Sequence, residues 1–275
     1  MPLMTSSDRE PGDDELDTVL QISLLLAEIP EQLEAYRAIE PVQPGARSAV
    51  AADDFILTPF PASQIVGTCL AAAADCLSAI DVLMHDGEDP FVWVFAQYPL
   101  LRSALEASSQ VLWLLGPESR RARVVRNLRV RATESKQDEL LFAPAFADSS
   151  TELSVQLAAA TVQTSELARI AEREGIPRND YLKKQLSYSE IVRAGSIAVG
   201  GDGARDETVW RLISGFAHPY TSRSRAFSTL HPLGSGGDST GVSAMMPNPM
   251  IVLLALNTAL NAFRAAVELT KTRMS

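Results

Sequence analysis

Apolar residues in this chain recur every three or four positions, and this spacing restricts the possible folds more than any other feature. Residues 62–85 show it best, with a stripe of Ile65, Cys69, Ala72, Cys76, Ile80 and Leu83. An α-helix turns once in about 3.6 residues, so such a stripe lies on one side of a helix and faces a core. Prolines and glycines separate the helical segments, and no series of alternating strands occurs. The sequence predicts an all-α antiparallel multi-helix bundle with irregular Gly/Pro-rich loops.

The helical pattern defines the expected elements. It covers residues 15–40 with a break at Pro30, 62–85, 90–115, 118–142, 150–174, two short pieces within 180–194, a segment around Trp210, and 249–272. Pro99 predicts a kink or a restart within the third of these segments, because proline lacks the amide hydrogen that a helix interior needs. Residues 41–61 are rich in proline, which favours an extended linker or a long loop. Residues 219–248 are expected to be irregular.

The acidic charge of the chain is concentrated at its N-terminal end. The formal net charge is −10, and residues 1–60 alone contain 12 acidic residues and three arginines. The sequence therefore predicts an acidic helical arm and linker over residues 1–60, followed by a single helical bundle domain over 61–275. An acidic total argues against bulk nucleic-acid binding, but it is compatible with a local basic site.

The cysteine pattern and the N-terminus point to a cytoplasmic protein. Cys69 and Cys76 lie seven residues apart on one helix, too far for a disulfide, and are expected to be buried free thiols. The N-terminal residues lack the basic and apolar blocks of a signal peptide. The longest uncharged run, residues 239–263, is interrupted by prolines and asparagines, so no membrane span is expected. No metal-ligand spacing and no cofactor fingerprint occurs, so neither a metal nor a cofactor is predicted.

The first candidate site lies in the segment around Trp210. At 100° per residue, Arg211, Ser214 and His218 fall on one helical face, and Pro219 should end the helix at His218. In a catalytic interpretation Arg211 holds a phosphate or carboxylate, His218 acts as general acid or base, and Ser214 donates a hydrogen bond. In the alternative interpretation Arg211 is solvated and His218 caps the helix end.

The second candidate is a polar face on an otherwise very apolar helix. Tyr98, Arg102 and Glu106 follow one another at intervals of four residues. Charges in such surroundings must be paired or hydrated, which suggests a pocket where Arg102 meets a small anionic ligand and Glu106 orients it. Asn257 and Asn261 of the last helix are candidates for the opposite wall of this pocket. The alternative is an intrahelical ion pair, although arginine before glutamate is the less favourable order.

A third candidate is a basic face near the start of the helix over residues 118–142. The arginines that form it are Arg120, Arg123, Arg126, Arg129 and Arg131. Such a face binds phosphate backbones, and RNA is one possible partner. It can equally dock the acidic N-terminal arm, or remain a solvated face.

The segments around Arg211 and Arg102 resemble known proteins. Arg211 and His218, separated by six residues, resemble the Arg-x(4–6)-His motif of HEPN domains. The wider pattern Trp-Arg-x-x-Ser-Gly-x-Ala-His, together with Arg102 and Glu106, is similar to a group of uncharacterised bacterial helical proteins. Leu212 differs from the polar residue that usually follows the arginine in HEPN nucleases. The resemblance implies a metal-independent RNA-processing or defence module, a site shared between two protomers, Arg211 steadying the phosphate and His218 moving the proton.

Three function classes therefore remain open from the sequence. The first is the HEPN-like RNA-processing module, and the second is a small-molecule-binding enzyme or sensor with a pocket at Arg102, Glu106 and His218. The third is a non-catalytic interaction or regulatory bundle. The distance between Arg102 and His218 tests the pocket interpretation, because side chains more than about 15 Å apart cannot belong to one hydrogen-bonded site.

Overall fold

The computed structural model describes residues 13–39, 43–86, 89–145, 151–182, 186–218, 220–232 and 243–275. Within them the chain forms the helices α1 (Asp13–Arg37), α2 (Ala49–Leu57), α3 (Ala62–Met84), α4 (Gln97–Leu115), α5 (Arg120–Ala145), α6 (Thr151–Arg173), α7 (Arg178–Leu182), α8 (Tyr188–Ala198), α9 (Gly203–Ala217), α10 (Thr221–Phe227) and α11 (Pro249–Met274). Two short antiparallel hairpins pair β1 (His85–Asp86) with β2 (Asp89–Pro90), and β3 (Thr229–Pro232) with β4 (Ser243–Met246). The predicted all-α class is confirmed.

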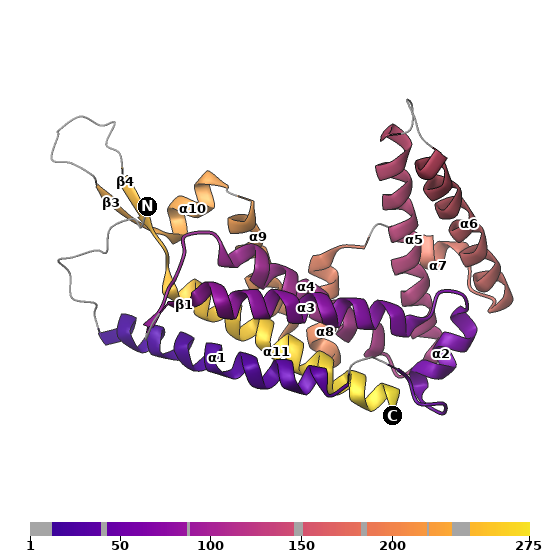
Figure 1. The fold of residues 1–275 in the computed structure, drawn as a ribbon, viewed down its shortest axis with the longest axis horizontal. Coiled ribbons are helices and arrows are strands. Elements are labelled where there is room, and N and C mark those ends of the chain that lie inside the picture. The colour runs from indigo at the N-terminus through magenta and orange to yellow at the C-terminus, as the bar shows by residue number, and fades with distance from the viewer. Residues whose placement is uncertain are drawn as a thin grey trace.

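Helix α4 is the centre of the bundle. It contacts α3, α11, α8 and α9, which surround it (Figure 1). Residues 111–115 are buried on every side, which explains why this part of the helix is apolar all round rather than on one stripe. Helices α5 and α6 pack on each other and, with α7, project from the long helices of the bundle (Figure 1).

The N-terminal helix belongs to this bundle. Helix α1 lies along α11 and also contacts α3 (Figure 1). Its inward side chains Ile22, Leu26 and Ile29 are buried in the same hydrophobic core as those of α3, α4 and α11. Residues 13–39 are therefore a core layer of the domain rather than a separate arm, and the boundary expected at residue 60 does not divide the described part of the chain.

Helix α2 lies inside the stretch that was expected to be a linker. Ser48 caps it by accepting a hydrogen bond from the backbone N–H of Ala51 at 3.0 Å. The prolines at positions 44 and 59 lie outside the helix, so they bound it instead of preventing it. Helix α2 packs against α3 and α5, and its buried Val50 and Leu57 extend the core.

Helix α4 begins later than expected. Residues 91–96 are not helical, and the Trp93 indole N–H donates to the Leu83 carbonyl at 3.1 Å, which fastens this segment to the end of α3. Helix α4 then starts at Gln97. Pro99 consequently falls in the first turn, where an amide hydrogen has no partner inside the helix, so no kink is required.

Two of the helices, α3 and α11, are long and apolar enough to cross a membrane by length and composition. Both contribute buried side chains to the core of the bundle, among them Leu70 and Leu77 of α3 and Leu256 and Phe263 of α11. Their apolar composition is thus explained by the positions they occupy beside α4.

Candidate functional site

Helices α4 and α9 bring Arg102 and His218 together. Helix α9 ends at Ala217, and the backbone of His218 has left the helical conformation with φ −108° and ψ 105°. Its ring nitrogen Nε2 lies 2.9 Å from Nη1 of Arg102, a contact between residues 116 positions apart. The expected helix end at His218 is therefore present, while Pro219 lies outside the described residues.

Glu106 and Trp210 complete the group, which we call the α4–α9 cluster (Arg102, Glu106, Trp210 and His218). Glu106 Oε1 accepts hydrogen bonds from Arg102 Nε and from the indole Nε1 of Trp210, both at 2.7 Å. The Arg102 guanidinium carbon lies 5.7 Å from the centre of the Trp210 ring. A charged acceptor, a charged donor and a facing ring fix the guanidinium in one orientation.

The geometry assigns the protonation of His218. Arginine only donates hydrogen bonds, so Nε2 of His218 must accept from Arg102. The imidazole is therefore neutral in this arrangement, with its hydrogen on Nδ1. No described residue accepts a hydrogen bond from Nη2 of Arg102. The cluster consequently presents, beside a neutral imidazole, a guanidinium nitrogen that none of the described residues occupies, and His218 is exposed there.

Tyr188, at the start of α8, is a neighbour of this cluster that the sequence patterns do not indicate. Burial raises the pKa of Tyr188, and the negative charge of Glu106 raises the pKa further. Its phenol therefore stays neutral. No spacing links it to Arg102 or His218, because the packing of α8 against α4 brings it there.

The catalytic group expected on α9 does not form as predicted. Arg211 donates from Nε and Nη2 to Oε1 of Glu207, at 3.0 and 2.7 Å. Ser214 Oγ donates to the backbone carbonyl of Trp210 at 2.7 Å. Glutamate four residues before arginine is the favourable order on a helix, so Glu207 holds Arg211 by a local ion pair. The same hydrogen bond lowers the pKa of Glu207. Of the three predicted residues only His218 joins the cluster.

Three of the residues predicted to line a pocket around Arg102 do not join the α4–α9 cluster. Tyr98 is buried and stacks on Phe216 with ring centres 4.5 Å apart, and burial raises its pKa to about 12. Asn261 donates to the Asn257 side-chain oxygen at 3.1 Å and accepts from Arg264 at 3.3 Å. Arg264 in turn pairs with Glu28 of α1, so these asparagines lie where α11 meets α1. They are part of a helix contact and not of the α4–α9 cluster.

The predicted basic face on α5 is largely engaged by the protein itself. Arg123 forms a two-point ion pair with Asp53 of α2, at 2.6 and 3.1 Å, and also donates to the carbonyls of Pro117 and Glu118. The other contacts join Arg126 to the carbonyl and ring of Trp113, Arg129 to the same ring, and Arg131 to Gln64 and Glu134. Only Arg120 among the five is fully exposed, so a continuous phosphate-binding stripe is not present. The contact with the acidic N-terminal region is made through Asp53.

Both cysteines are free thiols, as expected, but neither is completely buried. Burial, together with the negative charge of the nearby Glu134, raises the pKa of Cys69 to about 12. Burial also raises the pKa of Cys76. Since the thiolate is the reactive form, neither side chain is activated as a nucleophile.

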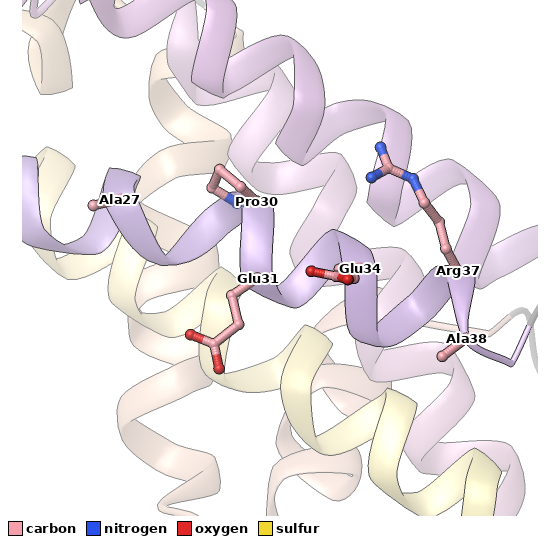
Figure 2. A pocket seen from close by; sticks show the side chains of 6 residues that line it. All are labelled: Ala27, Pro30, Glu31, Glu34, Arg37 and Ala38. Atoms are coloured by element: carbon pink, nitrogen blue, oxygen red, sulfur yellow. The ribbon is translucent and has the colours of Figure 1, made fainter.

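A hollow on the surface of α1 is separate from the cluster. Figure 2 shows it lined by Ala27, Pro30, Glu31, Glu34, Arg37 and Ala38, which all come from α1 and the residue after it. Both glutamates are exposed, and Arg37 is the only basic residue of the lining. The hollow is open and acidic, so its chemistry does not suit the anionic ligand that Arg102 would attract. Among the described residues, no group of histidine, cysteine and carboxylate side chains is arranged to hold a metal ion.

The α4–α9 cluster thus joins a guanidinium on α4 to an exposed imidazole that follows α9. The chain matches no protein-family model, no curated protein and no solved structure.

Proposed function

We propose that the α4–α9 cluster is a phosphate-binding acid–base site, and that the protein is a HEPN-like RNA-processing module. The observation that carries this proposal is the 2.9 Å contact between Arg102 and His218. It pairs a permanent cation with a neutral imidazole, which are the two groups needed to hold a phosphate and to move a proton. Arg102 takes the place that the sequence pattern assigns to Arg211.

The proposed reaction uses the ribose as its own nucleophile. His218 Nε2 accepts the proton of a 2′-hydroxyl, and the 2′-oxygen forms a bond to the adjacent phosphorus while the bond from phosphorus to the 5′-oxygen breaks. The products are a 2′,3′-cyclic phosphate and a 5′-hydroxyl, whose proton comes from solvent. Arg102 stabilises the negative charge on the phosphorane through its Nη2 donor. His218 is released from Arg102 as the phosphate takes over the guanidinium, and afterwards loses its proton to water.

Glu106 and Trp210 act by positioning in this proposal. Glu106 occupies Nε of Arg102 and so leaves the Nη nitrogens for the phosphate. Trp210 holds Glu106 from the other side and faces the guanidinium. Donors that are already held in position do not have to reorganise when the transition state forms, so a preorganised site stabilises it more than a mobile site does.

A binding site for a small anion is a second candidate function. The Arg102 side chain is only 23% exposed, which favours a compact phosphate or carboxylate over a long strand. In that case the protein is an enzyme or a sensor for a small molecule. The two candidates share the residues of the cluster and differ in the ligand.

The test incubates purified protein with total RNA in the presence of a chelator and follows the RNA lengths. We expect cleavage by the wild type, a loss of about 100-fold or more in rate for His218→Ala and Arg102→Ala, and wild-type rates for Arg211→Ala. Arg211→Ala is the matched control, because it removes an arginine of α9 that lies outside the cluster.

The outcomes separate the candidates. One outcome would reject the nuclease and support the small-anion site. In that outcome the wild type leaves the RNA intact, and phosphate or small carboxylates raise the melting temperature in a way that depends on Arg102. Equal cleavage by wild type and His218→Ala would show that the cleavage does not come from this cluster.

A further inference from the structure

An exposed aromatic ring lies directly beside the α4–α9 cluster. The chain turns at Tyr220 from the end of α9 into α10. The Tyr220 side chain is 57% exposed, and its ring centre lies 6.4 Å from that of His218 with the two planes tilted by 48°. One nucleotide of an extended single strand spans about such a distance, so a nucleotide held at His218 brings its base, or that of its neighbour, to this ring.

Arg223 supports the ring from α10. Its guanidinium carbon lies 5.8 Å from the centre of the Tyr220 ring, and its Nη1 donates to the carbonyl of Arg211 at 2.6 Å. Gly215 makes room for this side chain, since a Cβ there would lie 2.3 Å from Cδ of Arg223. The guanidinium is thus held across α9 by a hydrogen bond, and the ring is held by the guanidinium.

The charge around the ring suits a polyanion. Helix α10 contains Arg223 and Arg225 and no acidic residue. Arg223 faces the exposed ring, and Arg102 contacts the neighbouring His218, so two cationic groups lie near the ring. Aromatic rings flanked by arginines are the arrangement that binds unpaired nucleotides, by stacking on the base and attraction of the phosphates.

We infer that Tyr220, held in place by Arg223, stacks on a nucleobase, and that this stacking selects single-stranded RNA for the α4–α9 cluster. This inference rests on the proposed function, because it supplies the substrate class for that site. A base in a duplex already stacks on both neighbours and cannot reach the ring, so paired RNA is disfavoured. Every base has a flat face, so this stacking distinguishes single-stranded from paired RNA but does not distinguish one base sequence from another.

The test measures binding apart from cleavage. A fluorescein-labelled 2′-O-methyl oligouridine has no free 2′-hydroxyl to attack, and its affinity is followed by fluorescence anisotropy in a chelator. We expect Tyr220→Ala to weaken binding by about tenfold or more, and Tyr220→Phe to stay within about twofold of the wild type, because stacking needs the ring and not the hydroxyl. Gly215→Ala, which displaces Arg223, should weaken binding in the same direction.

Two further probes decide the interpretation. An oligonucleotide of the same length with abasic spacers should bind wild type and Tyr220→Ala equally, and a duplex of the same length should show no dependence on Tyr220. Binding that depends on Arg102 but not on Tyr220 overturns the stacking step and leaves the proposed function intact. Absence of any RNA binding by the wild type overturns both.

Discussion

At the residue scale, the Glu106 carboxylate both forms an ion pair within α4 and links α4 to α9. Its Oε1 accepts from Arg102 four residues earlier and from Trp210 on α9. A carboxylate shared by a guanidinium and an indole is worth more than a solvated ion pair, since both donors are partly buried and lose a charged acceptor together when it is removed.

Neutralising this carboxylate should therefore weaken the fold as well as the site. Glu106→Gln is expected to lower the free energy of unfolding by about 1–3 kcal/mol, measured by urea denaturation. Glu166→Gln is the matched control; its partner Arg169 is exposed, so its effect should stay below about 0.5 kcal/mol. Equal unfolding midpoints for the two variants would show that Glu106 contributes no more than a surface pair.

Of the three residues predicted on α4, Arg102 and Glu106 join the α4–α9 cluster and Tyr98 does not; of the three predicted on α9, only His218 joins it. Arg102 and Glu106 could be recognised because charges are conspicuous on an apolar helix. Arg211 was misplaced because a helical projection shows which residues share a face but not that Glu207, on the same face, captures the guanidinium. Tyr188 gives no signal in the sequence, because its place beside Glu106 depends on the packing of α8 on α4.

At the element scale, the arginines of α5 bind groups on neighbouring helices rather than forming an open basic surface. Arg123 joins α5 to α2 through Asp53, and both side chains are almost completely inaccessible. Arg126 reaches back to Trp113 near the end of α4. A projection of residues 120–131 shows a basic face, but it cannot show which neighbouring helices bring acceptors and rings to that face.

Removing one partner of the buried pair should be strongly destabilising. Asp53→Ala leaves the Arg123 charge without its carboxylate, and we expect a loss of about 3–5 kcal/mol in the free energy of unfolding. Arg169→Ala, which breaks the exposed pair with Glu166, serves as the control and should change the stability by less than about 1 kcal/mol. A small loss for Asp53→Ala in thermal or urea unfolding would contradict the role of this pair in holding α2 on α5.

The helices themselves were predictable where apolar periodicity is long, as in α3 and α11. Helix α2 was missed because nine residues between prolines give little periodicity, and its stability comes from the Ser48 cap and from packing on α3 and α5. The start of α4 was misplaced because the contact of Trp93 with the end of α3 holds residues 91–96 outside the helix.

At the scale of the whole molecule, the N-terminal acidic helix is part of the single core. The side of α1 that faces the core differs from the side that faces solvent, and two leucines in the same turn show the difference. Leu26 faces α11 and α3 and is 1% exposed, whereas Leu24 faces solvent and is 60% exposed. The charge distribution suggested a separate arm because the described acidic residues lie on the outer side of α1 and give no information about its buried apolar side.

This pair of leucines provides a direct test of the domain organisation. Leu26→Ala should cost about 2–5 kcal/mol and unfold the whole bundle in one transition at lower urea concentration. Leu24→Ala should change the stability by less than about 0.5 kcal/mol. If Leu26→Ala instead produced an early separate transition with the main transition unchanged, α1 would be an independent arm.

The contact between Arg102 and His218 also has a consequence for the synthesis of the protein. It joins positions 116 residues apart, and His218 is held beyond the end of α9. On the ribosome, a nascent chain that has not yet released α9 from the exit tunnel contains Arg102 and Glu106 but not yet the docked His218. Under the proposed function, the site is incomplete during most of translation, and the messenger and the ribosomal RNA around the growing chain would meet a complete site only after α9 has emerged and docked.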